Sequence, residues 1–590
     1  MATSHAWDLS RSPFVELMGT NYAPSADQLN NIKTLLVKPY AELERLEMEI
    51  ARALCEKEKI NNFVEAHRAL MSPIRQIPDE VLGEIFVHCL PTDRNAIRSL
   101  DEAPLILTTI CRDWRRVALN THRLWSSLHI FLPPDLSHQA MSRRLTGVRT
   151  WLGRSGTLPL SISLHTRSRP VHSPFKSATS PPPEFFINNA KLLIGTIASF
   201  CDRFGDLFLS LPPLFLKMFD ELSGSSFPVL QHFRVRDADV HNGTPSLWGH
   251  EEENDDVWFA TLLARTAVLK SLRVSDIHVP AGGYLDLPIN WGNLTNLNLQ
   301  SSENQGLFTS DALTMIQRSP NLQHLHICFL LSLDHHLNST PIGRIVLPHL
   351  RTMRFHFSPS RVSFEENDTF RSQVSSIFGS LSTPSLKLLS LSGWNGDRSI
   401  NMKSIHDESE IPFHQLETLE LALEMTPKEL TECLSSMPEL ISFHFKDMRV
   451  PPSFSDHHLS ALTPSHENPT PLCPKLTAIR IILSMHMLEE VNSVTSSTIL
   501  EFARSRAQTL KTFDMYFDQD QSFAEDDLIA LRKLKENGLN MRLHYANYPV
   551  PQQDSPSYGL PSEPVFQLPM PANRKQISDM EGIYGTRYIV

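Results

Sequence analysis

The sequence lacks the features that mark secreted, membrane-spanning and metal-binding proteins. It has no run of about 18 apolar residues, and its first residues are not a charged region followed by an apolar one. Its seven cysteines are scattered, with no Cys-x-x-Cys pair and no Cys/His ligand spacing. We therefore expect a soluble protein of the cytoplasm or nucleus that has no membrane partner and binds no metal or cofactor.

Signatures of catalysis and of nucleic-acid binding are also missing. The net charge of −11 and the pI near 6.2 argue against nucleic acid as a partner. No phosphate-binding glycine loop occurs, and residues 153–156 are too short for a nucleophile elbow. The Asp-His-His runs at 334–336 and 456–458 lack further ligands at metal spacing, and the acidic run 251–256 suits a helix start. We expect a protein that is not an enzyme.

A long amphipathic helix is predicted over residues 25–71. Ser25 and Gln28 form a capping-box pattern at its start. Apolar residues then recur in two heptad rows: Leu36, Leu43 and Ile50 in one, and Leu46, Ala53 and Ile60 in the other. Pro39, where a kink or a restart is expected, lies inside the pattern. Two hypotheses stay open, a coiled-coil homodimer through residues 25–70 and a helix packed on its own chain.

Short helices are predicted between residues 77 and 118. In the first part, apolar residues at 77, 81, 82, 85, 86, 89 and 90 follow helical spacing, and Pro78, Asp79 and Glu80 suit a first turn. In the second part, one stripe joins Leu107, Ile110, Cys111, Trp114, Val117 and Ala118. The apolar piece 124–128 follows and is expected to return to the same core. Such a small core is marginal alone and is expected to need a partner's surface.

These motifs resemble an F-box. The pattern Ile-Pro-x-Glu-Val-Leu-x-x-Ile-Phe is followed by Cys-Arg-x-Trp-Arg and then by Leu-Trp, as in the F-box proteins that are numerous in fungi and often carry a heptad-like helix just upstream. Ile77 stands where leucine is usual, and the segment 91–103 is longer than in many members of the family.

The resemblance implies that this segment docks onto a Skp-type adaptor, which binds a cullin scaffold, while the rest of the chain selects a protein substrate. The adaptor-facing residues it implies are Ile77, Pro78, Val81, Leu82, Ile85, Phe86, Leu107, Ile110, Cys111 and Trp114. The alternative is that these residues form only the core of a small helical domain.

Internal repetition dominates the chain after residue 225. The pattern Leu-x-x-apolar-x-apolar recurs every 24 to 39 residues. Its copies start at Leu230, Leu269, Leu294, Leu322, Leu350, Leu386, Leu416, Leu440, Leu476 and Leu510. Helical patterns lie between copies, for example at 311–318, 426–434 and 497–506. A strand and a helix in each unit predict a leucine-rich-repeat solenoid. The repeats resemble the irregular ones attached to many F-box proteins, without the usual asparagine or cysteine after each strand.

The whole chain is therefore predicted to be multidomain: an all-α F-box with an upstream amphipathic helix, followed by an α/β leucine-rich-repeat solenoid. The boundaries are a disordered N-terminus (1–24), the helix (25–71), the F-box (72–131), a connector with a Pro/Ser-rich loop (132–200), the solenoid (201–544) and a disordered tail (545–590). The expected function is substrate recognition in a cullin-type ubiquitin ligase. The alternative is a repeat scaffold without that role. The substrate-binding residues are unknown, although Gln323, His324 and His326 are where substrate contacts are sought first.

Overall fold

The computed structural model describes most of the chain. The described stretches are 8–166, 183–223, 226–238, 258–277, 283–300, 306–331, 343–359, 367–393, 409–423, 425–447, 452–466, 468–483, 494–517 and 524–545, with positions 279 and 405. The acidic run 251–256, the His pair 335–336, most of the Pro/Ser-rich loop and nearly all of the tail fall outside them. The chain forms two compact units, Met1–Glu84 and Ile85–Val590, each of which is described by itself.

The first unit consists mainly of one long helix. The short helical turns η1 (Leu9–Arg11) and η2 (Val15–Leu17) precede α1 (Ala26–Leu70), and η3 (Pro73–Gln76) follows it. The predicted capping box is confirmed, because the Gln28 amide donates to Ser25 Oγ and the Ser25 amide donates to Gln28 Oε1 (2.9 Å). The helix continues through Pro39 without a break.

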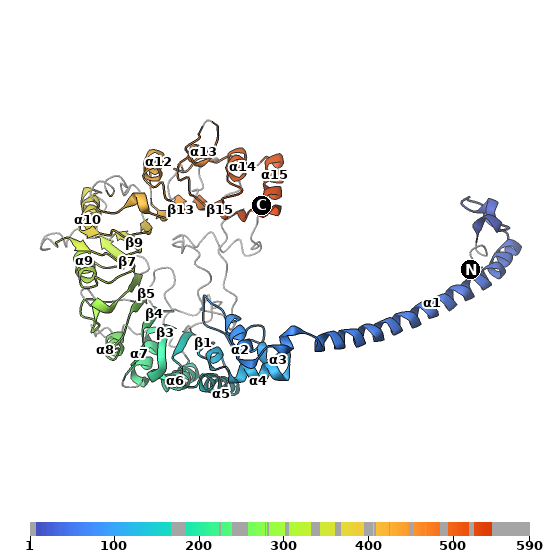
Figure 1. Ribbon diagram of the computed structural model, residues 1–590, viewed down its shortest axis with the longest axis horizontal. Coiled ribbons are helices and arrows are strands. Elements are labelled where there is room, and N and C mark those ends of the chain that lie inside the picture. Colours follow the sequence, from blue (N-terminus) through green and yellow to red (C-terminus); the bar gives the residue numbers. More distant parts are fainter. Residues whose placement is uncertain are drawn as a thin grey trace. The chain divides into compact units, whose positions relative to one another are not determined.

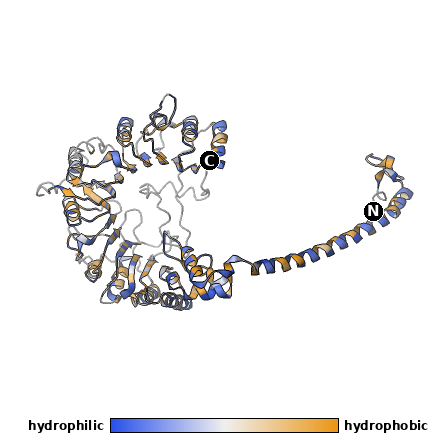
Figure 2. Cartoon of the chain, viewed as in Figure 1, coloured by the Kyte–Doolittle hydropathy of each residue, from blue (hydrophilic) through white to orange (hydrophobic). Residues whose placement is uncertain are grey.

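Apolar residues recur along the whole of α1 (Figure 2), and many of their side chains are exposed. Leu43 of one heptad row is 54% exposed, and Ile60 of the other is 56% exposed. An exposed apolar row of this length is what a coiled-coil partner would cover. The homodimer and the helix packed on its own chain both stay predictions.

Three short helices follow: α2 (Asp79–His88), α3 (Leu107–Ile110) and α4 (Arg112–Asn120), with the turn η4 (His122–Trp125). The predicted single stripe from Leu107 to Ala118 is wrong in one respect. Cys111 is extended (φ −155°, ψ 174°), so it ends α3, and its Sγ accepts the Trp114 amide at the start of α4 (3.5 Å). The residues of the stripe therefore belong to two helices.

The second unit contains a parallel sheet of 14 strands with helices on its outer side (Figure 1). Neighbouring strands follow one another along the chain, apart from the short strands β8 (Ile345–Val346) and β10 (Leu381–Ser382), which pair with each other. The sheet consists of β1 (Ser127–Leu132), β2 (Leu160–Thr166), β3 (Phe204–Leu211), β4 (His232–Asp237), β5 (Ser271–Ser275), β6 (Asn296–Gln300), β7 (His324–Leu331), β9 (Thr352–Pro359), β11 (Leu388–Gly393), β12 (Thr418–Ala422), β13 (Ser442–Asp447), β14 (Ala478–Leu483), β15 (Thr512–Phe517) and β16 (Met541–Tyr545). This is an α/β solenoid.

Helices or turns connect most of these strands. The helices are α5 (His138–Arg154), α6 (Glu184–Ala198), α7 (Pro213–Leu222), α8 (Trp258–Ala264), α9 (Thr309–Gln317), α10 (Asn367–Gly379), α12 (Pro427–Ser435), α13 (Asp456–Leu462), α14 (Ser496–Ser505) and α15 (Glu525–Glu536). The turns η5 (Cys201–Arg203), η6 (Trp291–Asn293) and η7 (Phe413–Gln415) precede strands. The core lies between the helices and the sheet, because strand residues facing the helices, such as Leu272 and Val274, are fully buried.

The repeat pattern predicted the strands of the solenoid correctly. In each of the ten copies, a strand begins two residues after the leading leucine, which is buried. The solenoid nevertheless begins earlier than predicted. The piece 124–128 leads into β1, the first strand of the sheet, and the predicted connector (132–200) contains β2, α5 and α6. These first units escape the pattern because their strands lack the full leucine spacing.

The free edge of β1 is joined to the chain just before α3. The His129 amide donates to the carbonyl of Ala96 (2.7 Å). The Asn95 side chain accepts from the hydroxyls of Ser127 (3.0 Å) and Ser161 (2.8 Å) and donates to Ser163 Oγ (3.0 Å). One amide thus binds residues of both β1 and β2.

Candidate functional site

The ten residues of the predicted adaptor-binding set lie in different environments. Five are exposed: Pro78, Val81 (51%), Ile85 (41%), Ile110 (57%) and Cys111. Two are half-buried, namely Ile77 and Trp114, and three are buried, namely Leu82, Phe86 and Leu107. The buried three belong to the core of the chain, so they can support a binding surface without forming it. Adaptor binding itself stays a prediction.

Helix α2 is apolar on two faces. Phe86 is 1% exposed and its ring contacts that of Trp114 on α4, with centroids 4.9 Å apart. Ile85, the preceding residue, is 41% exposed, and Val81 lies one turn before it on the same outer face. A helix that only covered a core would have a polar outer face. The outer face of α2 therefore has the character of a contact surface.

A second candidate surface follows from the register of the sheet. One residue from each strand lies in a row that crosses all 14 strands, which we call the central row. Its members are His129, Ser163, Phe208, Arg234, Arg273, Asn298, His326, Arg354, Ser390, Glu420, His444, Arg480, Asp514 and Arg542. On both sides along each strand the neighbouring residues face the helices, so the row lies on the inner face of the sheet.

Ion pairs lie at three places along the charged part of the central row. Arg234 pairs with Asp206 (3.0 Å), and Arg354 pairs with Glu420 across one strand (3.2 Å). Asp514 is fully buried and accepts from both Arg480 (2.9 Å) and Arg542 (2.8 Å). These carboxylates hold their arginines in fixed directions, as charge-assisted hydrogen bonds do.

Arg273 differs from the other arginines of the row. Its hydrogen bond goes to the amide oxygen of Gln300 (3.0 Å), and in the described part of the chain no carboxylate lies within ion-pair distance of it. Burial, together with the charges of Arg234, Arg236 and Arg354, lowers the pKa of the Arg273 guanidinium. Positive charge is therefore concentrated around Arg273.

Gln300 also fixes the tautomer of His326. A guanidinium can only donate, so Gln300 Oε1 faces Arg273 and its Nε2 faces His326 Nδ1 (3.2 Å). The amide then donates to Nδ1. Burial and the charges of Arg354 and Arg273 lower the pKa of His326 to about 3, so the ring is neutral near pH 7 and carries its hydrogen on Nε2.

The three residues sought first for substrate contacts lie close to this row. His326 is a member of it. His324, two residues earlier in β7, is exposed and bonded to Thr352 Oγ1 (3.0 Å), while Gln323 is exposed in the turn before the strand. The sequence does contain a signal for the arginines, because in all ten repeat copies the fourth residue after the leading leucine is the central-row residue.

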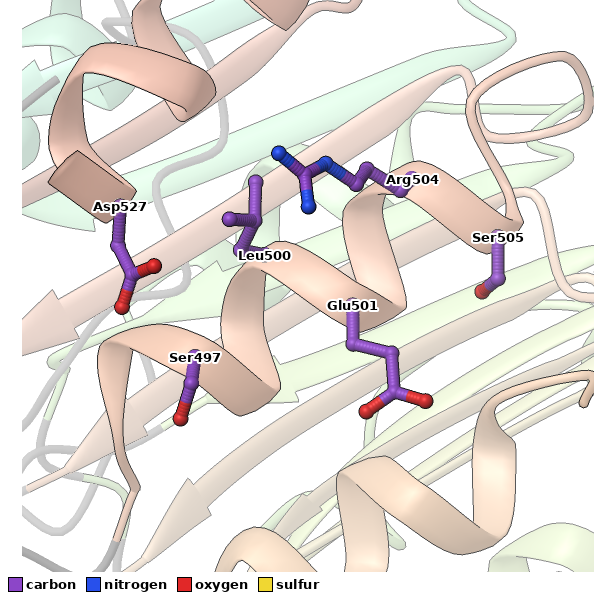
Figure 3. Close-up of a pocket in the computed structure, with 6 residues that line it drawn as sticks. All are labelled: Ser497, Leu500, Glu501, Arg504, Ser505 and Asp527. Atoms are coloured by element: carbon purple, nitrogen blue, oxygen red, sulfur yellow. The ribbon is translucent and has the colours of Figure 1, made fainter.

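One hollow on the surface, of about 470 Å³, is lined by Ser497, Leu500, Glu501, Arg504, Ser505 and Asp527 on α14 and α15. Figure 3 shows Glu501 pointing away from Arg504. These six residues include no nucleophile beside a general base. In the stretches that the structure describes, no group of three His, Cys, Asp or Glu side chains could hold a metal ion, and no helix is long and apolar enough to cross a membrane.

The second Asp-His-His run, at 456–458, has a structural role. His458 is 1% exposed, and its Nδ1 lies 3.2 Å from the Ser455 amide at the start of α13. Its Nε2 lies 3.0 Å from the carbonyl oxygen of Pro427. Both ring nitrogens are occupied, so neither is left for a metal.

Comparisons with known proteins identify no family. No family model matches the chain, and no curated protein matches it. Among solved structures, it is similar to the crystal structure of the Rad7 and Elc1 complex in yeast, with 13% identity and a TM-score of 0.35 over 81% of this chain and 95% of that chain.

Proposed function

We propose that this protein is a substrate-recognition subunit of a cullin-type ubiquitin ligase. The segment from Ile77 to Trp114 acts as an F-box and binds a Skp-type adaptor, and the inner face of the solenoid holds a protein substrate. The observation that carries the proposal is the exposure of Ile85 on α2 and Ile110 on α3. Both positions belong to the F-box-like motif, and both apolar side chains would be covered by an adaptor.

The buried members of the motif support this function indirectly. Phe86 and Leu107 hold α2 and α3 in place, so that Ile85 and Ile110 are presented on ordered helices. Contact surfaces of this kind take their affinity from a few apolar side chains that become fully desolvated. Ubiquitin transfer itself would be carried out by other subunits of the ligase.

The test is binding of a recombinant Skp-type adaptor to the full chain. Ile110→Glu places a charge in the proposed interface and is expected to lower the affinity at least about ten-fold. Ile529→Glu is the matched control, because Ile529 on α15 is similarly exposed (48% against 57%) and lies outside the motif. Its affinity should equal that of the wild type. Circular dichroism and thermal unfolding would show that both variants fold.

The same experiment separates this function from a scaffold role. A folded wild-type chain that does not bind the adaptor would contradict the proposal and favour a repeat scaffold outside the ubiquitin system. Equal loss of binding in both variants would show that the contact does not involve the motif.

A further inference from the structure

The central row changes in charge along the sheet. Between β4 and β9 it contains Arg234, Arg273 and Arg354, whereas between β12 and β16 it contains both acidic and basic residues. Asp206 and Glu420 pair with the arginines at the two ends of this part, and Asp276, directly after β5, pairs with Arg236 (3.0 Å). The middle of this part, around Arg273, has a surplus of positive charge.

Donors on the next two strands extend this middle part. Asn298 of β6 follows Arg273 in the row, and its Oδ1 is buried without a hydrogen-bond partner in the described part of the chain. Oδ1 can only accept a hydrogen bond, so an oxyanion would bind the other end of the amide, Nδ2, which donates. His326 of β7 comes next, with its hydrogen on Nε2. A guanidinium, an amide and an imidazole N–H thus follow one another at strand spacing.

We propose that Arg273, together with Asn298 and His326, binds an oxyanion of an acidic peptide segment that crosses the inner face of the solenoid between β4 and β9. Carboxylates of Asp or Glu and the phosphoryl group of a modified Ser or Thr share the required chemistry, because each presents two or more oxygens to a guanidinium fork. Arg354 lies three strands beyond Arg273, about 14 Å away, which about four extended residues span. The proposal rests on the proposed function in taking the inner face as the substrate surface.

A peptide fits this row better than a nucleic acid does. A polyanion lying along the whole row would meet Glu420 and the buried Asp514 on the strands after β9. Like charges at such positions would repel its phosphates. A short acidic segment can contact the arginines without lying over Glu420 and Asp514. The remainder of the partner can be of mixed charge, like the later strands.

The test measures binding of labelled peptides of about twelve residues to the full chain by fluorescence anisotropy. One peptide alternates Gly and Glu, a second has Gln in place of each Glu, and a third is the Gln peptide with one phosphoserine. We expect the Glu or the phosphoserine peptide to bind, and the stronger of the two to identify the source of the oxyanion. The Gln peptide should bind at least about ten-fold more weakly.

Arg273→Gln is expected to lower the affinity for the bound peptide at least about ten-fold. Arg542→Gln is the matched control, because Arg542 lies in the same row and Asp514 keeps Arg480 when it is removed. Its affinity should change less than about two-fold. Asn298→Asp provides a second variant, since it would give Arg273 a carboxylate within the chain and so displace the peptide. Adaptor binding should be unchanged in all three variants.

Several results would overturn the proposal. One is equal affinity for all three peptides, and another is an equal effect of Arg273→Gln and Arg542→Gln. A third is a single-stranded DNA oligonucleotide that displaces the peptide and itself loses affinity in Arg273→Gln. The adaptor experiment depends on Ile110 and this one on Arg273, so the two can fail separately. Peptide binding without adaptor binding would leave the oxyanion site in place on a scaffold protein.

Discussion

Neutral histidines on the inner face of the sheet make the solenoid sensitive to acid. Burial and neighbouring arginines lower the pKa of His326 from 6.5 to about 3, and burial lowers that of His356 to about 4. A histidine whose pKa is lower in the folded state contributes its full share of stability above the unfolded pKa, and that share is lost as the pH falls toward the folded value. Stability should therefore decrease below about pH 6.5.

The size of the effect follows from the two pKa values. At pH 5 the ring of His326 binds a proton in the unfolded chain and stays neutral in the folded one, which favours unfolding by about 2 kcal/mol. The groups around the ring are Arg273 on β5, Gln300 on β6, and Arg354 and His356 on β9. None of them offers a carboxylate that would stabilise the imidazolium.

Hydrogen exchange of the amides in β6, β7 and β9 measures this effect locally, which suits a solenoid whose repeats can open separately. After correction for the intrinsic exchange rate, protection in the wild type should fall about thirty-fold more between pH 7 and pH 5 than in His326→Gln. His414→Gln, at an exposed histidine, should behave like the wild type. An equal loss of protection between pH 7 and pH 5 in the wild type and in His326→Gln would show that protonation of His326 does not destabilise the sheet.

Two further predictions concern Arg506 and α1. Arg506 is 3% exposed and donates to five backbone carbonyls, of Leu462, Leu472, Cys473, Pro474 and Leu476. Arg506→Leu should lower the free energy of unfolding by about 3–5 kcal/mol in urea titrations, because buried acceptors lose their donor, whereas exposed Arg504→Leu should stay within about 0.5 kcal/mol. On the homodimer hypothesis, Ile50→Asp in the heptad row should give a monomer in sedimentation equilibrium, while Met48→Asp, with similar exposure (60% against 58%), should not. A monomeric wild type would contradict that hypothesis.

The strands could be predicted from the sequence, whereas the exposure of individual site residues could not. A leucine two residues before each of ten strands is a local pattern that each unit must satisfy to bury its own core, so it is readable from one sequence. The environments of Val81 and Leu82 could not be separated in this way. Both are apolar and adjacent on α2, and only packing decides that one is 51% and the other 4% exposed. Likewise, whether a carboxylate of the described residues lies within ion-pair distance of Arg273 depends on which strands lie beside it, which spacing alone does not determine.

The bonds between Asn95 and the first two strands have a consequence for distance. They join the chain before α3 to one end of a sheet whose strands are spaced about 4.8 Å apart, so each position on the inner face has a set number of steps from the F-box-like helices. Arg273 lies four strands from β1, about 19 Å along the sheet. The number of repeat units would thus set the distance from α3 to a bound segment. Removing one unit before β5 would move that segment one strand spacing, about 4.8 Å, closer to α3 and leave its contacts unchanged.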